Sequence, residues 1–311
     1  MKIILFALNK NEPVNERKFG KRVHCRFHTT CRGNGSTQTT TQGTYFIFVW
    51  GILIILQDAM AWSRLRPTVG KYQIYYYYFK RWSRLGIIDS FVTKYIDIYA
   101  TLKGSFTHMY TDTSLIKNKH GTDNLGRNPC DRGRPGNKIA VLCDDLKIPL
   151  SLIVFTANFA DQNTVIPLFE ELSTCVIDNS GGPTTVAADR GYTATDKMTN
   201  ELIPYNARLI APLRRLPDSE EPVDENGKPK KPKKKKPKDV KKPKKPREPR
   251  PELPKEDQDK LKKRYLIGHF NSRFKQFKRL DKRYERKCAH FKNFLDIMRS
   301  LLLIEAIGKM A

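Results

Sequence analysis

The sequence predicts a mixed α/β fold: one central sheet with flanking helices, preceded by a small helical region. Between residues 105 and 216, short apolar runs of strand composition alternate with segments of helical pattern, as in a sheet covered by helices. Helical periodicity dominates before this region and returns from Asp259 to about Ile307. With 311 residues, 39% of them apolar, the chain can bury a substantial core.

The N-terminal part divides into a polar tail and a helical region. Residues 1–42 are rich in Thr and Gly, and we expect them to be poorly ordered. A cluster of metal-ligand types lies in this tail: His24, Cys25, His28 and Cys31. No second pair at zinc-finger spacing follows it, so we interpret the cluster as part of the tail. The uncharged run at 45–56 is shorter than the roughly 20 residues of a membrane-spanning helix, which favours a buried helix.

Residues 43–100 combine cations with aromatic side chains in a helix-turn-helix-like rhythm, punctuated by Pro67 and Gly70. Arg81 is one of several basic residues that alternate with Trp and Tyr here. This interleaving suits contacts to a DNA backbone. It suits the core of a small helical domain equally well, and the sequence leaves both interpretations open.

Two aspartates end predicted strands in the region 105–216: Asp112 in "MYTDTS" and Asp189 in "AADRGY". Either one alone is more simply a turn or capping residue. Together they predict carboxylates at one edge of the sheet, which is the usual way to hold Mg²⁺. Two such ions about 4 Å apart align an attacking and a leaving oxygen at phosphorus.

Positive charge is concentrated in two segments. Residues 228–250 carry 14 Lys and Arg against two acids, and residues 260–292 carry 13 against two, so together they hold +23 of the formal net charge of +26. Such focused charge indicates a polyanionic partner, above all nucleic acid. Neither segment has the apolar, tryptophan-bearing face of a membrane-surface helix. The six scattered cysteines are typical of reduced thiols.

Residues 217–258 hold ten of the nineteen prolines, so we expect a disordered Lys/Pro-rich insertion. Residues 259–311 then form a basic helix that completes the domain, with Asp257 or Asp259 as N-cap. One face of this helix gathers five cations around Gly268: Arg264, Lys275, Arg279, Lys282 and Arg286. The opposite stripe should pack on the sheet; it comprises Ile267, Phe270, Phe274 and Phe277.

These segments resemble insertion-sequence-type DDE transposases from about Trp50 to about Leu303. "TDTS", the strands after it, "ADRGY" and the last helix carry the resemblance. The resemblance implies a ribonuclease-H-like fold with a three-acid metal site that cuts and joins DNA strands. It also implies that Asp112 and Asp189 are two of the catalytic, metal-binding acids.

The last helix of the family carries a tyrosine, an arginine, a glutamate and a lysine. The corresponding places here hold Leu261, Arg264, Gly268 and Lys275. The resemblance therefore implies that the third carboxylate is missing at Gly268, and that Arg264 and Lys275 contact phosphates near the cleaved strand. The nearest possible substitutes are Glu256, Asp257, Asp259, Glu285 and His269. No acid among them lies within a turn of Gly268, and His269 points about 100° away, so we expect no replacement.

We therefore expect a transposase-family protein that binds double-stranded DNA and whose Mg²⁺-dependent strand cleavage and transfer is impaired. Two carboxylates should hold Mg²⁺ or Mn²⁺ only weakly. The alternative is a non-catalytic DNA-binding protein derived from a transposase. We expect no membrane partner, allow for a homodimer, and expect the protein inside the cell with DNA, in the nucleus if the host is eukaryotic.

Overall fold

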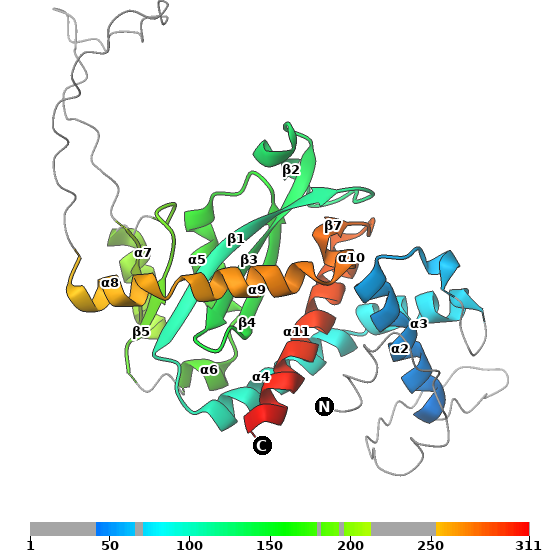
Figure 1. Ribbon diagram of the computed structural model, residues 1–311, viewed down its shortest axis with the longest axis horizontal. Helices are drawn as coiled ribbons and strands as arrows, with labels where there is room; N and C mark the ends of the chain where they lie inside the picture. The colour runs from blue at the N-terminus through cyan, green and yellow to red at the C-terminus, as the bar shows by residue number, and fades with distance from the viewer. Residues whose placement is uncertain (1–41, 66–70, 179–181, 193–195, 213–252, 311) are drawn as a thin grey trace, which may run out of the picture.

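The computed structural model describes residues 42–65, 71–178, 182–192, 196–212 and 253–310 (Figure 1). The His/Cys cluster of the tail and the Lys/Pro-rich run lie outside the described residues. Within the described ranges, no helix is both long and apolar enough to cross a membrane.

A mixed sheet forms the centre of the fold. Its strands are β1 (His108–Asn118), β2 (Gly126–Arg127), β3 (Pro135–Asp144), β4 (Pro149–Thr156), β5 (Thr184–Ala187), β6 (Ala207–Ile210) and β7 (Lys282–Arg283). β1, β3 and β4 are antiparallel neighbours, and β5 and β6 continue the sheet in parallel on the other side of β1. β1, β3, β4, β5 and β6 coincide with the five predicted runs, and the predicted mixed α/β class is confirmed.

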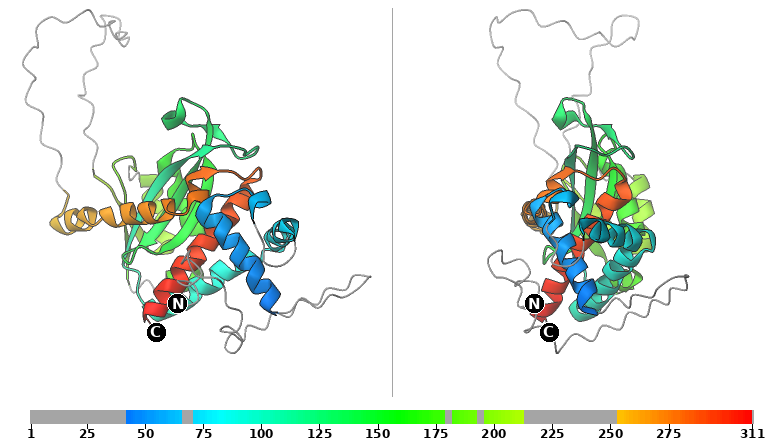
Figure 2. Two further views of the ribbon diagram at one scale, coloured as in Figure 1. Left: turned by 45° about the vertical axis from the view of Figure 1, so that its right-hand side comes forward. Right: turned by 90° about the vertical axis from the view of Figure 1, so that its right-hand side faces the viewer.

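Helices cover both faces of this sheet (Figures 1 and 2). They are α2 (Gln42–Asp58), α3 (Tyr72–Arg84), α4 (Ile87–Lys103), α5 (Val165–Glu170), α6 (Thr174–Asp178), α7 (Asp196–Leu202), α8 (Lys255–Lys262), α9 (Tyr265–Lys275), α10 (Lys278–Asp281) and α11 (Cys288–Met310). Short 3₁₀ turns occupy Trp62–Arg64, Pro129–Asp131, Asp161–Thr164 and Ile203–Tyr205. Helix α9 crosses one face of the sheet in front of β1, and α11 runs beside α4 (Figure 1).

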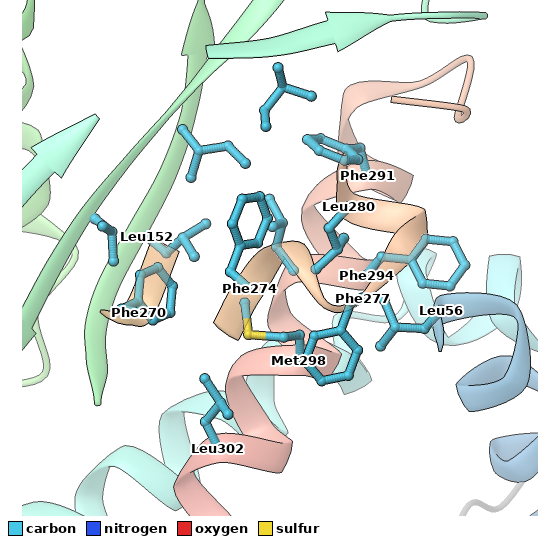
Figure 3. Close-up of a cluster of buried hydrophobic side chains, with 14 of the residues drawn as sticks. Leu56, Leu152, Phe270, Phe274, Phe277, Leu280, Phe291, Phe294, Met298 and Leu302 are labelled. Carbon is cyan, nitrogen blue, oxygen red and sulfur yellow. The ribbon is translucent and has the colours of Figure 1, made fainter. Parts of the chain in front are cut away.

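Each face of the sheet has its own apolar core. On one face, Tyr110 and Leu152 of the sheet pack with Phe270 and Phe274 of α9. Figure 3 shows this cluster continuing through the residues of α10 and α11 to Leu56 of α2. On the other face, helices α4, α5, α6 and α7 pack on the strands around residues such as Met109 and Leu142.

The N-terminal helices belong to the first of these cores. The run at 45–56 lies in α2, where Ile55 and Leu56 are fully buried, as predicted. On α3, Tyr75 and Phe79 are buried, and Phe79 stacks on Phe294 of α11. The core interpretation therefore holds for these two aromatics, whereas Tyr77 is exposed. The predicted domain boundaries stay predictions.

The single basic helix predicted from residue 259 onward is wrong. The chain instead forms α8, α9, α10, the short strand β7 and α11. Phe277 has an extended backbone, and this break turns Phe277 and Leu280 into the core. Asp257 is not an N-cap: helix α8 begins after Pro254, and the Asp257 carboxylate pairs with Arg208 of β6 at 2.6 Å.

Candidate active site

Asp112 and Asp189 lie level with each other on neighbouring strands. The parallel register pairs Tyr110 of β1 with Ala187 of β5, and each aspartate follows its member of this pair by two residues. Asp189 comes after the end of β5, as predicted. The prediction that Asp112 ends a strand is wrong, because β1 continues to Asn118. It continues because β3 pairs with it along its whole second half.

Helix α9 places one polar face over these two carboxylates. At its start, Nη1 of Arg264 lies 3.3 Å from Oδ1 of Asp189. Two turns further on, Nδ2 of Asn271 donates to Oδ2 of Asp112 at 3.0 Å. Because residues spaced by three or four share a helix face, Gly268 lies between these two contacts on the same face. The structure thus brings together Asp112, Asp189, Arg264 and Gly268.

Neither packing nor backbone conformation accounts for a glycine at position 268. The residue is exposed, and a Cβ atom built on it meets nothing within 4 Å. It lies within the regular helix α9, away from any turn. The polar face therefore has open space at position 268.

Asp112 sits in a mixed electrostatic environment. Burial raises the pKa of its carboxyl above the ordinary value, and the charge of Asp189 also raises it. A hydrogen bond from the Thr113 backbone, the charge of Arg264 and the hydrogen bond from Asn271 lower it. The amide and the guanidinium thus provide for the two carboxylates part of the stabilisation that a cation would provide.

Asn271 is a contact of the candidate site that the sequence did not reveal. Besides binding Asp112, its Oδ1 accepts from the hydroxyl of Ser114, two residues along β1, at 3.2 Å. The available signal was its spacing, since Asn271 lies three residues after Gly268 on the face of Arg264. Only the placement of α9 on β1 shows that this amide reaches the carboxylate.

Three of the acids that flank Gly268 in sequence are engaged elsewhere. Asp257 pairs with Arg208, Asp259 with Lys262 at 2.7 Å, and Glu285 with Arg279 at 2.7 Å. Glu256 lies exposed on α8, and the His269 ring stands edge-on to Tyr265.

Asp161 is a further acid near β1, but it bonds to Thr113 and Lys138. Thr113 follows Asp112 directly, so its side chain leaves the opposite face of the strand. Among the described residues, no group of three or more His, Cys, Asp or Glu could hold a metal ion. The three-acid metal site implied by the resemblance does not fit the residues at this position.

The predicted phosphate contacts fall into different settings. Lys275 is exposed on α9, on the face of Gly268. Arg279 corrects the prediction, because only 5% of it is exposed and its guanidinium binds Glu285 and the Met60 carbonyl. Lys282 and Arg286 are exposed but lie on β7 and the following turn, outside the helix predicted to carry them. Arg81 is half-buried on α3.

The family described as "Transposase DDE domain" matches residues 106–303. This is more than half of the chain, and the chain belongs to that family. No curated protein sequence matches it.

Two solved structures are similar at low identity. The piggyBac transposase synaptic complex with hairpin DNA has a TM-score of 0.41 and 13% identity, over 66% of this chain and 47% of that one. The Mos1 transposase paired-end complex with the left transposon end has a TM-score of 0.24 and 10% identity, over 67% and 71%. The chain thus spans about half the length of the piggyBac transposase. Both TM-scores are below 0.5, so neither likeness supports a conclusion about this chain.

Proposed function

We propose that this protein is a DNA-binding member of the transposase family in which strand cleavage is impaired. One observation carries the proposal. The face of α9 that meets Asp112 and Asp189 has glycine and open space at position 268, where the family carries its third carboxylate. Displacements of about 1 Å already cost about a hundredfold in rate, so an acid a helical turn or more away cannot replace it.

Binding of double-stranded DNA is supported by the charge of the chain and by its family. Arg264 and Lys275 keep the family spacing beside the carboxylates, and Arg264 contacts Asp189 directly. A phosphate entering this site would meet cations before it met the carboxylates. The homodimer that the sequence allows stays a prediction.

The test is nicking of supercoiled plasmid DNA with Mg²⁺ or Mn²⁺, which needs no knowledge of the transposon ends. We expect little or no nicking from the natural protein and measurable nicking from Gly268→Glu. The activity should disappear when Asp189→Ala is added. Gly268→Gln is the matched control, because it has the same length and no charge.

Strong nicking by the natural protein that depends on both Asp112 and Asp189 would overturn the impairment. It would mean that the third acid comes from elsewhere. The second candidate function, a DNA-binding protein without catalysis, is favoured by the Arg264–Asp189 and Asn271–Asp112 contacts, since these use the carboxylates as partners of protein side chains. It predicts no gain of nicking in Gly268→Glu and unchanged DNA affinity in Asp189→Ala.

A further inference from the structure

The segment between β1 and β3 forms an arm that projects beyond the rest of the sheet. It includes β2 and the turn at Pro129–Asp131, and Figure 1 shows it extending past the ends of the neighbouring strands. Strand β7 joins its base: Lys117 pairs with Lys282, and the backbone amides of Lys119 and Thr122 donate to the carbonyls of Arg283 and Arg286. Segments about 160 residues apart in sequence thus form one surface.

Two acids in these segments form ion pairs with buried arginines. Arg283 is fully buried, and its guanidinium binds the Asp123 carboxylate. Glu285 is buried against Arg279. Between residues 117 and 134 the chain has five Lys and Arg against two acids, and between 282 and 287 it has four against one.

The exposed Lys and Arg side chains of the arm, together with those of residues 282–286, form one surface, which we call the β-arm surface. It comprises Lys117, Lys119, Arg127 and Arg134 of the arm with Lys282 and Arg286. Lys119 lies over the ring of Tyr284 at 5.0 Å. Asp131 is the arm's remaining acid; only 18% of its side chain is exposed, and it lies 3.6 Å from Lys117. Asp281, at the end of α10, is exposed at the edge.

The pairing of Lys117 with Lys282 is the most informative feature of the surface. The two exposed lysines are in register on parallel strands, next to further cations, so their like charges repel each other. Asp131, 3.6 Å from Lys117, offsets part of this repulsion. A bound polyanion would remove this repulsion.

We propose that the β-arm surface binds the sugar-phosphate backbone of duplex DNA at a distance from the carboxylates. The proposal rests on the DNA binding proposed above and adds a second contact to it. Lys117 follows Asp112 by five residues along β1, about 17 Å at strand spacing, and its side chain leaves the opposite face of the strand, the face of Thr113. At that distance the surface adds affinity and fixes the position of the duplex, and it takes no part in cleavage.

The first experiment compares two charge-matched double variants of the full chain. Lys117→Gln with Lys282→Gln changes the β-arm surface. Lys94→Gln with Lys147→Gln is the control, because these exposed or half-buried lysines lie on α4 and in the turn at the far end of β3 from the arm. Binding to a fluorescent duplex is measured from about 50 to 300 mM salt. Each phosphate that a variant no longer neutralises should lower the slope of log affinity against log salt by about 0.9.

We expect the arm variant to bind about tenfold more weakly at 150 mM salt, with a slope lower by about 1 to 2. The control should bind like the natural protein. The thermal midpoint of the arm variant should stay the same or rise, because the lysine repulsion is gone. A purely structural role for the pair would instead lower the midpoint and leave the salt slope unchanged.

The second experiment uses lysine acylation and mass spectrometry to measure which lysines the bound duplex covers. Saturating duplex should protect Lys117, Lys119 and Lys282 from acylation and leave Lys94 and Lys147 reactive. Two results would overturn the β-arm surface and leave the proposed function intact. The first is equal weakening of DNA binding in both double variants. The second is no protection of the three lysines while Lys275→Gln weakens binding. No binding of the natural protein to duplex DNA would overturn both.

Discussion

Gly268 is a position where the absence of a side chain brings no structural gain. The helix continues through it, and the space beside it is open. Its neighbours on the same face, Arg264 and Asn271, still reach toward Asp189 and Asp112. This combination fits the proposal that the site has kept its supporting residues and lost one ligand.

Replacing Gly268 by alanine should stabilise the protein by up to about 1 kcal/mol, because alanine is the better helix residue and nothing obstructs its Cβ atom. Urea denaturation of Gly268→Ala measures this gain. Gly268→Glu should gain less without metal, since the new carboxylate repels Asp112 and Asp189. With Mn²⁺ the gain should increase, and the natural protein should show a smaller metal response. A destabilised Gly268→Ala variant would show that position 268 needs glycine.

The residues of the site were predictable only in part. Asp112 and Asp189 follow from the order of motifs and strands along the chain, and Arg264 follows from its spacing to Gly268. Asn271 could not be predicted, because its role depends on how far along β1 the helix lies. The prediction that Arg279 contacts phosphate was wrong, because it continued the helical periodicity of α9 beyond Lys275, where the helix ends and the chain bends.

At the scale of elements, apolar runs predicted the strands well, but they did not predict where the C-terminal helices begin and end. β3 is buried over most of its length and β4 over its first half, so composition alone marks them. β7 has two residues and exists only because β1 pairs with it. The bend between α9 and α11 follows from burial of Phe277 and Leu280 against distant parts of the chain, and a local pattern cannot show this.

Arg283 joins the β1–β3 arm to β7 and should be essential for the stability of both. It is fully buried and donates to the Asp123 carboxylate, the Asn137 side chain and backbone carbonyls on both segments. Arg283→Met should lower the free energy of unfolding by about 3 kcal/mol, because several buried acceptors lose their donor. Urea denaturation measures the loss. Arg286→Gln is the exposed control and should change stability by less than about 0.5 kcal/mol; equal losses would contradict this role.

Helix α11 contains a buried carboxyl that should give the fold a pH dependence. Burial raises the pKa of Asp296 to about 6, while Lys292 and Arg299 lower it and Glu171 and Asp89 raise it. Between the ordinary value of 3.8 and about 6, the folded protein binds more protons than the unfolded chain. Stability from this group is therefore present at low pH and is lost as the pH rises through that window.

Asp296→Asn should flatten the stability profile between about pH 4 and 6, removing a slope that totals on the order of 2 kcal/mol. Urea denaturation at several pH values measures it. Asp89→Asn makes the same charge change on an exposed residue near Lys292 and should leave the slope in place. An unchanged slope in Asp296→Asn would assign the pH dependence to another group.

At the scale of the whole molecule, basic residues occur in two structural roles. Buried cations such as Arg279 and Arg283 hold the fold together through acids of their own. Exposed cations gather on the β-arm surface, with few acids among them, whereas α9 presents the exposed Lys275 and, at its start, the half-buried Arg264. The Lys/Pro-rich run at 228–250 adds a net charge of +12 shortly before α8 in the sequence. Its contribution to DNA binding stays a prediction from composition.

Deleting residues 228–250 should weaken duplex binding and flatten its salt dependence, by about 0.9 in slope for each phosphate no longer neutralised. The thermal midpoint should stay unchanged, since a segment of this composition cannot contribute a packed core. The matched control replaces the run with a Gly/Ser segment of equal length. If charge is what binds, this variant should behave like the deletion. If the Gly/Ser variant binds like the natural protein, the run is a spacer. An unaltered salt slope in both variants would leave a localisation signal as the remaining role of the run.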